Sequence, residues 1–196
     1  IQHRRAVEIG CGANGGNAGV LVAGLGFEAL LLDGDQALID IARRLLAGYR
    51  ATIEKAWITR EGVNDILAAR AFDRDLDYVG IDLDGMDYWI WESLAVQPRV
   101  IVCEYNPVFG PQASVTVPYS PTFNRNARDR KGHYVQPKGY YGASISALER
   151  LGRRKGYDLV CSAPASENVY FVRRDANPGI APRTAAEAFR LPTKGK

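Results

Sequence analysis

Short apolar runs alternate with stretches of helical spacing along the first half of the chain. The apolar runs predict strands at residues 5–9, 29–33, 51–58, 76–81 and 99–104. The stretches between them predict helices at residues 17–24, 36–49, 62–71 and 88–94. Strands and helices that alternate in this way form a mostly parallel sheet with helices on both faces.

The second half of the chain opens with a long segment that shows no clear periodicity. This segment, residues 105–140, is rich in Pro, Gly and polar residues, and a loop of that length usually serves a function. Helical spacing returns at residues 144–155, and residues 158–162 and 168–173 predict two strands joined by a short turn. We therefore expect an α/β fold whose seven-stranded, mostly parallel sheet ends in an antiparallel hairpin.

Length and composition fit one globular domain. The chain has 196 residues, of which 46% are hydrophobic and 24% are charged, so it can bury a core. We assign residues 1–174 to this domain and the polar residues 175–196 to a loosely docked tail. Because no apolar run approaches the roughly 20 residues of a spanning helix and no signal peptide is evident, we expect a cytoplasmic protein without a membrane partner.

The net charge of +3 at pH 7 is too small by itself to indicate a nucleic-acid partner. Its placement tells more, because cationic side chains crowd into the long segment. They are Arg125, Arg128, Arg130, Lys131, His133 and Lys138. Two interpretations stay open, contact with an anionic substrate or a merely solvated loop. No recognition helix or aromatic platform is evident, so the sequence does not favour nucleic acid.

Glycines crowd the turn between the first predicted strand and the first predicted helix, which reads GCGANGGN at residues 10–17. Glycine lets the backbone approach a ligand and adopt positive φ, and the helix that follows offers unpaired N–H groups. We therefore predict a nucleotide-like ligand at this turn. Its candidate contact residues are Gly10, Gly12, Gly15 and Asn17. The spacing also fits the dinucleotide fingerprint, and a turn that only packs helix against strand is a further alternative.

Asp33 ends the second predicted strand and is followed by Gly34. A carboxylate in this place accepts hydrogen bonds from a ribose diol, whereas Asp35 begins the next helix as its N-cap. The pattern thus predicts a ligand that contains a ribose. It does not choose between the ligands that do.

Several motifs, taken in order, resemble a known family. They are Val7-Glu8-Ile9-Gly10, Leu31-Leu32-Asp33-Gly34-Asp35, Gly80-Ile81-Asp82-Leu83-Asp84-Gly85-Met86-Asp87-Tyr88 and Val102-Cys103-Glu104-Tyr105-Asn106-Pro107. They look like the motifs of uncharacterised bacterial methyltransferase-like proteins, which are distant relatives of the FkbM-type sugar O-methyltransferases. The resemblance covers residues 7–174 and identifies the chain as similar to class I S-adenosylmethionine-dependent methyltransferases.

The resemblance implies a Rossmann-like fold, an antiparallel seventh strand and S-adenosylmethionine as the cofactor. It places Glu8 and Gly10 beside the methionine part of the cofactor and Asp33 at its ribose. Ala56 and Trp57 would then line the adenine. The chain departs from the family at the glycine turn, where similar proteins often carry Gly-Ala-Trp-Asp-Gly after the first strand.

Oxygen-bearing side chains follow the fourth and fifth predicted strands, which are expected to be neighbours in the sheet. Asp82, Asp84, Glu104 and Asn106 offer the ligands that a hard ion such as Mg²⁺ prefers. A metal here would lower the pKa of a substrate hydroxyl. The alternative is that Asp84 and Asp87 cap the helix that starts nearby.

Three residues are candidates for catalysis. Without a metal, Asp82 or Glu104 would act as a general base if burial raised its pKa, and Asp82 is also expected to contact the cofactor. His133 is a candidate base or substrate contact, with an exposed histidine of no function as its alternative.

The expected activity is methyl transfer from S-adenosylmethionine to a hydroxyl of a small polar acceptor. The resemblance suggests a sugar-like acceptor, and the basic segment suggests an anionic one. Two alternatives stay open: an NAD(P)-dependent oxidoreductase that uses the same glycine turn, and a methyltransferase-fold binding module without turnover. The sequence leaves the oligomeric state open.

Overall fold

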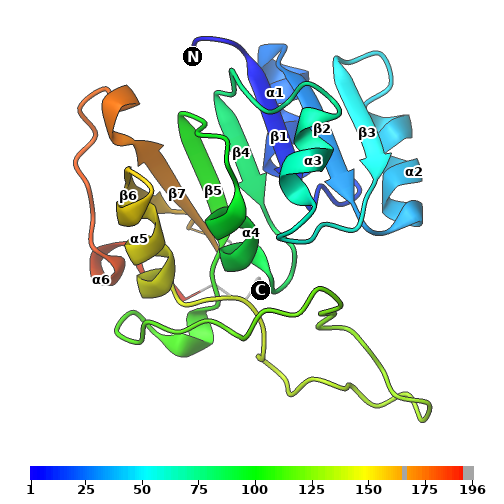
Figure 1. The fold of residues 1–196 in the computed structure, drawn as a ribbon, viewed down its shortest axis with the longest axis vertical. Helices are drawn as coiled ribbons and strands as arrows, with labels where there is room; N and C mark the ends of the chain where they lie inside the picture. The colour runs from blue at the N-terminus through cyan, green and yellow to red at the C-terminus, as the bar shows by residue number, and fades with distance from the viewer. Residues whose placement is uncertain (165–166, 192–196) are drawn as a thin grey trace. The chain divides into compact units, whose positions relative to one another are not determined.

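The computed structural model describes residues 1–164 and 167–191 (Figure 1). Seven strands follow the order β3-β2-β1-β4-β5-β7-β6, and the predicted mostly parallel sheet with an antiparallel hairpin is confirmed. The chain divides into two compact units, and the expected domain 1–174 and tail 175–196 stay predictions. The first unit comprises Ile1–Asp82 and Ser93–Val102, and the second comprises Leu83–Glu92 and Cys103–Lys196. Among the described helices, none has the length and apolar character to cross a membrane.

Parallel strands form the centre of the first unit. They are β1 (Arg5–Ile9), β2 (Glu28–Asp33), β3 (Ala51–Lys55) and β4 (Tyr78–Ile81). β1 pairs with β2 on one side and with β4 on the other, and β3 pairs with β2. β1, β2 and β4 are apolar and buried along nearly their whole length, as expected for parallel strands covered on both faces.

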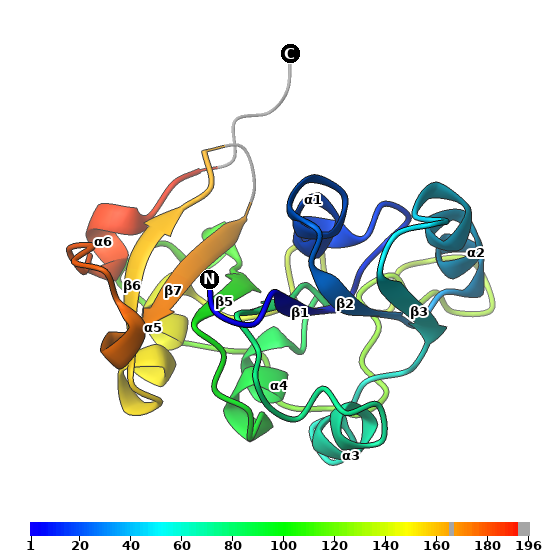
Figure 2. The same ribbon diagram turned by 90° about the horizontal axis from the view of Figure 1, so that it is seen from above.

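Helices cover both faces of these strands. α1 (Gly16–Leu25) and α2 (Gln36–Leu45) lie on one face, and α3 (Val63–Ala68) lies on the other (Figure 2). α1 packs against β1, β2 and β4. α2 is shorter than the predicted helix 36–49, because the chain turns out of the helix towards Gly48, whose φ of 85° a right-handed helix cannot contain.

The second unit is organised around a predicted hairpin, which the structure confirms. Its strands are β6 (Tyr157–Ser162) and β7 (Asn168–Arg173), with the end of β5 (Val100–Glu104) in the same unit. α4 (Asp87–Ser93) supplies Trp91 to the core, where its ring lies 4.6 Å from that of Phe171. α5 (Ile145–Arg154) places Gly152 against these rings, since a Cβ there would lie 3.0 Å from Phe171.

The end of the chain differs from the expected loosely docked tail. After η2 (Arg174–Ala176), residues 185–188 form the short helix α6 (Ala185–Ala188), which contacts α5 and β6 and buries both terminal alanines. A capping box between Thr184 and Glu187 begins it. The signal was in the sequence as Thr184-Ala185-Ala186-Glu187, a known pattern of helix starts that the polar composition obscured. Residues 192–196 of the expected tail lie outside the described residues.

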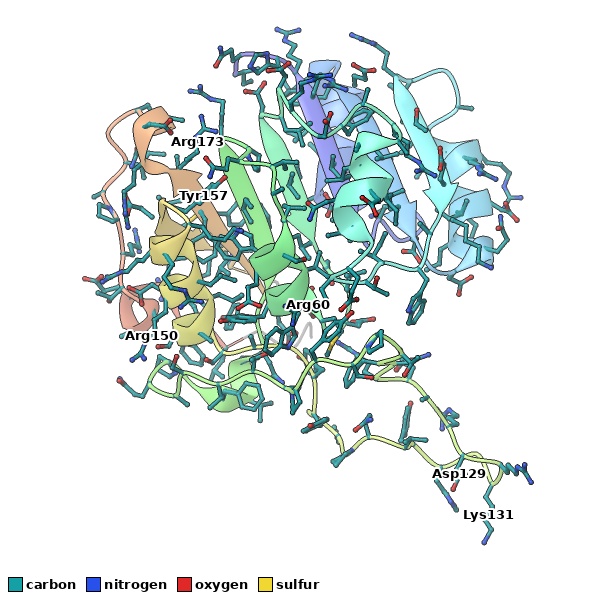
Figure 3. The ribbon with its side chains drawn as sticks, in the orientation of Figure 1. Arg60, Asp129, Lys131, Arg150, Tyr157 and Arg173 are labelled. Atoms are coloured by element: carbon teal, nitrogen blue, oxygen red, sulfur yellow. The ribbon has the colours of Figure 1, made fainter. Side chains whose placement is uncertain are left out.

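The long segment 105–140 carries local structure of its own. It starts with η1 (Pro107–Phe109), and an antiparallel bridge between Arg128 and Tyr134 closes a hairpin-like excursion further on. We call residues 127–135 the finger. Figure 3 shows Asp129 and Lys131 at its tip, pointing away from α4 and α5 of the same unit.

Candidate functional site

The glycine turn after β1 presents bare backbone to open space. Gly12 has a φ of 53°, and a Cβ at this position would meet no heavy atom within 4 Å. The N–H groups of Gly10 and Cys11 donate to the carbonyl of Leu32, at 2.8 and 3.0 Å, and so tie the turn to β2. A ligand can therefore approach the main chain closely at Gly12.

Asp33 at the end of β2 faces this turn. Its Oδ2 accepts the N–H of Gly12 at 2.9 Å, and its Oδ1 accepts the N–H of Asp35 at 2.8 Å. The side chain is half-buried. Because a carboxylate offers about four acceptor positions, room remains for the two hydroxyls of a ribose.

An exposed indole stands next to Asp33. The N–H of Ala56 donates to the Asp33 carbonyl at 2.8 Å, which fixes the start of the segment after β3. Trp57 follows, 56% exposed, and lies over Gly34, where a Cβ would come within 3.0 Å of the ring. The absence of a side chain at Gly34 thus leaves room for the indole. An exposed aromatic face such as this one can stack on a purine.

Glu8 of β1 is fully buried and holds the beginning of α1. Its Oε1 accepts the N–H of Asn17 at 3.2 Å, and its Oε2 accepts the N–H of Ala18 at 2.9 Å. The N–H of Gly16 donates to the Asn14 side chain at 3.1 Å. The first turn of α1, which in dinucleotide-binding proteins receives the pyrophosphate, is therefore already satisfied from within.

Two glycines make room for the Glu8 carboxyl group. A Cβ at Gly16 would stand 2.6 Å from Oε1, and a Cβ at Gly80 on β4 would overlap Oε2. Burial raises the pKa of Glu8 to about 8, against the hydrogen bonds from α1, and the neighbouring charge of Asp82 adds to the rise. Asp82 follows β4, is half-buried, and donates its N–H to the Ile9 carbonyl at 2.8 Å.

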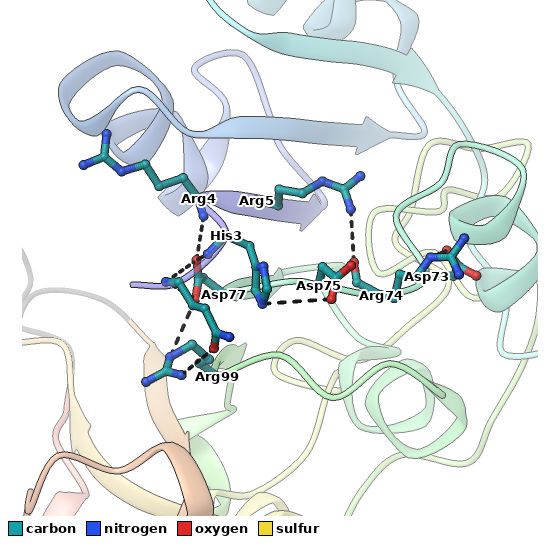
Figure 4. Close-up of polar contacts among 9 residues, drawn as sticks. His3, Arg4, Arg5, Asp73, Arg74, Asp75, Asp77 and Arg99 are labelled. Carbon is teal, nitrogen blue, oxygen red and sulfur yellow. Dashed lines mark hydrogen bonds and ion pairs between the residues drawn. The ribbon is translucent and has the colours of Figure 1, made fainter.

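A second buried carboxylate, Asp77, lies at the opposite ends of the same strands (Figure 4). It accepts the N–H groups of Gln2, His3 and Arg4 at 2.7–3.0 Å, and the Arg99 guanidinium lies 3.6 Å away. Burial opposes ionisation of Asp77, but these hydrogen bonds together lower its pKa below the ordinary value.

In the second unit, Arg125 binds two of the predicted metal ligands. Its Nη1 lies 2.6 Å from Oδ1 of Asp84 and 3.8 Å from Oε1 of the buried Glu104. The ring of Tyr141 stacks on the guanidinium at 4.4 Å. In the sequence Arg125 is one member of a basic segment, and nothing distinguishes it from its cationic neighbours.

Further contacts fasten the long segment to the turn that precedes α4. Phe123 packs on Gly85, where a Cβ would overlap its ring. The Tyr141 hydroxyl donates to Glu167 at 2.7 Å, and burial together with this bond raises the pKa of Tyr141. Arg125 is therefore held in place from several sides.

Asp87 and Asn106 have structural partners. Asp87 accepts the N–H groups of Leu83 and Gly85 at 2.8 and 3.0 Å, and α4 begins at this residue, which supports the helix-start interpretation of the acidic stretch. Asn106 is fully buried, donates to two carbonyls of residues 139–141 and accepts the N–H of Val108 at 3.0 Å. Its side chain holds the long segment in shape.

His133 lies on the finger and not in the cluster around Glu104. Its side chain is 75% exposed, and Nδ1 lies 3.4 Å from the Asp129 carboxylate. The structure therefore gives His133 the surroundings of an exposed turn residue, and its catalytic role stays a prediction. The predicted contacts of Glu8, Gly10, Gly15 and Asn17 with a cofactor likewise stay predictions.

No family model and no curated protein matches the chain. Among solved structures, an S-adenosylmethionine-dependent methyltransferase from Methanosarcina mazei is 12% identical, with 88% of this chain and 92% of that chain covered and a TM-score of 0.48. One from Mesorhizobium loti is 15% identical, with 86% and 90% covered and a TM-score of 0.48. A glycopeptide N-methyltransferase solved with S-adenosylmethionine is 13% identical, with 85% and 79% covered and a TM-score of 0.46.

The fold class rests on the chain's own topology. The strand order, with β6 antiparallel to β7, gives the Rossmann-like class I methyltransferase fold that the sequence analysis expected. The relationship to the FkbM-type enzymes stays a prediction, because no family model matches.

Proposed function

We propose that this chain is a class I S-adenosylmethionine-dependent methyltransferase whose first unit binds the cofactor. The observation that carries the proposal is the contact of Glu8 with α1, because its carboxyl group accepts the N–H groups of Asn17 and Ala18 at the start of this helix. A dinucleotide would need those groups for its pyrophosphate, whereas a nucleoside without phosphate does not. This argument favours the methyltransferase over the NAD(P)-dependent oxidoreductase.

The residues around Gly12 fit an adenosine. Asp33 has acceptor positions left for the ribose hydroxyls, Trp57 offers an exposed ring for the adenine, and Gly12 leaves open space above the backbone. When bound, S-adenosylmethionine supplies a methyl group on a strongly electrophilic sulfonium. The task left to the chain is to align the acceptor and to receive its proton.

For the acceptor we propose a hydroxyl of a small polar molecule, sugar-like or anionic. Glu104 is buried at the end of β5 and is our candidate for the base that takes the hydroxyl proton, with Asp82 as the second candidate. The Mg²⁺ site stays a prediction, and this proposal does not depend on it. The Arg125 guanidinium contacts both Asp84 and Glu104, and the Asn106 amide is engaged by the main chain.

The test is calorimetric titration with S-adenosylhomocysteine of the wild type, Asp33→Ala and Asp35→Ala. Loss of charge-assisted bonds to the ribose should weaken binding to Asp33→Ala by about tenfold or more, which corresponds to about 1.5–3 kcal/mol. Asp35 only caps α2, through the N–H of Ala37 at 2.7 Å, so its variant should bind within about twofold of wild type.

Two results would contradict the proposal: absence of wild-type binding, or equal weakening in the two variants. Thermal unfolding of both variants serves as the control for fold, since each carboxylate also accepts main-chain N–H groups.

A further inference from the structure

The finger is a hydrogen-bonded hairpin whose residues are mostly exposed. The N–H of Val135 donates to the Ala127 carbonyl at 2.9 Å, and the N–H of Asp129 donates to the His133 carbonyl at 2.9 Å. The Asp129 carboxylate then accepts the N–H groups of Lys131 and His133, at 2.8 and 3.0 Å. A side chain that closes a turn in this way fixes the tip and the direction of the residues it carries.

Arg128 stiffens the base of the finger. Its guanidinium stacks on the Tyr134 ring at 3.8 Å and donates to the Gly132 carbonyl at 2.9 Å. Tyr134 remains 58% exposed, and Val135 next to it is 56% exposed. The finger thus holds out an aromatic ring, which the sequence analysis did not recognise as a platform because ring exposure cannot be read from the sequence.

The charge of the finger is concentrated and unbalanced. The finger carries three cationic side chains, Arg128, Arg130 and Lys131, and a single carboxylate, that of Asp129, whereas the whole chain carries a net charge of only +3. Arg130 and Lys131 are exposed, and neither forms an ion pair within the part of the chain that the structure describes. Lys138 adds a further exposed cation just beyond the finger.

The position of the tip decides what kind of partner it can reach. Asp129 and Lys131 point away from α4 and α5 of their own unit (Figure 3). A partner that meets cations and an exposed ring on a protruding tip is extended and anionic.

We propose that the finger is a binding surface for single-stranded nucleic acid. Phosphates pair with Arg130 and Lys131, and an unpaired base stacks on the exposed part of Tyr134. An anionic membrane fits less well, because segments that bind a membrane surface bury a broad apolar face, whereas the large apolar side chains that the finger exposes are Tyr134 and Val135. An acidic protein would account for the exposed cations but does not require a ring on which a base can stack. The proposal is independent of methyl transfer.

The experiment uses the whole chain and a fluorescein-labelled oligouridylate of about 12 nucleotides, with fluorescence anisotropy at about 50 and about 200 mM salt. The double variant Arg130→Ala/Lys131→Ala should bind at least about tenfold more weakly at low salt. Its dependence of log affinity on log salt should be shallower by about 0.7 for each phosphate that the variant no longer neutralises. The matched control, Arg44→Ala/Arg150→Ala, removes two exposed cations elsewhere and should bind within about twofold of wild type.

The ring is tested separately. Tyr134→Ala should weaken binding several-fold with an unchanged salt slope, since stacking gives about 1–3 kcal/mol per base, whereas Tyr134→Phe should retain affinity. The proposal is overturned if the oligonucleotide does not bind at low salt, or if the control double variant loses as much affinity as the finger variant. Equal or tighter binding to polyglutamate, or to vesicles that contain phosphatidylserine, would also overturn it. Binding of S-adenosylhomocysteine should be the same in every finger variant.

Discussion

The first unit buries one carboxyl group at each end of its central strands, and the two differ in their hydrogen-bond donors, in their charged neighbours and in their pKa. Asp77, at the amino ends of β1 and β4, has three main-chain donors and a nearby arginine, and its pKa is lowered. Glu8, towards the carboxyl end of β1, has two main-chain donors and an acidic neighbour, and its pKa is raised to about 8.

We interpret this difference as one between a carboxylate that stabilises the fold and a carboxylate at the proposed cofactor site. Asp77 is compensated for its loss of water and fastens the first residues of the chain to the sheet. The hydrogen bonds of Glu8 compensate only in part for its loss of water, and its carboxyl group lies at the helix start beside which we propose that the ligand binds. In parallel α/β sheets the ligand lies outside the carboxyl ends of the strands, which is where the less compensated carboxylate stands.

The largest expected effect is on pH dependence. The ordinary pKa of Glu8 is 4.5 and its pKa in the folded chain is about 8, so the folded chain keeps a proton that the unfolded chain has lost between these values. The contribution of Glu8 to the free energy of unfolding therefore falls as pH rises through this window and levels off above it. Asp77 acts in the opposite sense, because its stabilisation is present above the ordinary pKa of 3.8 and is lost as pH falls through the lowered value.

Urea unfolding of wild type and Glu8→Gln from pH 5 to pH 8 measures this effect. The stability of Glu8→Gln relative to wild type should rise with pH, at up to about 1.4 kcal/mol per pH unit. A difference that stays constant across the window would show that Glu8 has no raised pKa.

Asp77→Ala should have the next largest effect, on stability alone. Its loss leaves three main-chain N–H groups without their acceptor and removes the ion pair with Arg99, and should reduce the free energy of unfolding by about 3 kcal/mol. Affinity for S-adenosylhomocysteine, measured well below the unfolding temperature, should stay within about twofold of wild type. The prediction fails if Asp77→Ala loses more affinity for S-adenosylhomocysteine than a core variant of equal stability does. Asp77 would then contribute to binding as well as to stability.

Gly80→Ala tests the space around Glu8. The new methyl group would overlap Oε2 of Glu8, so the substitution should cost about 2 kcal/mol of stability and weaken cofactor binding as the helix start shifts. In the double variant Glu8→Ala/Gly80→Ala the overlap disappears, and the two effects on stability should be non-additive by about 1 kcal/mol. If the two effects on stability are additive, the absence of a side chain at Gly80 is not what makes room for Glu8.

Trp57→Ala should have the smallest effect on the fold and a selective one on binding. Because the indole is 56% exposed, unfolding free energy should change by less than about 0.5 kcal/mol. If the ring stacks on adenine, affinity for S-adenosylhomocysteine should fall about tenfold, and Trp57→Phe should restore most of it. Unchanged affinity would remove Trp57 from the site.

The general fold could be predicted from the sequence because apolar runs and helical spacing report directly on burial. The strands, the glycine turn and Asp33 follow from that pattern. α6 was missed although a capping box precedes it, since a four-residue helix is too short to show periodicity.

The interior of the site was harder to predict. The motif pointed to Glu8, but its position at the start of α1 depends on the absence of side chains at Gly16 and Gly80, which lie far from each other in sequence. Similarly, the pairing of Arg125 with Asp84 and Glu104 depends on how a long segment returns to the turn before α4. The pattern of charges along the chain does not reveal which arginine of a basic segment will pair with distant carboxylates.

The most direct test of the central claim compares two ligands on the wild-type chain by calorimetry, S-adenosylhomocysteine and NADH. Since Glu8 already takes the N–H groups at the start of α1, S-adenosylhomocysteine should bind with micromolar affinity and NADH should not bind detectably. Binding of NADH as tight as that of S-adenosylhomocysteine would contradict the account and would indicate that the glycine turn binds a dinucleotide.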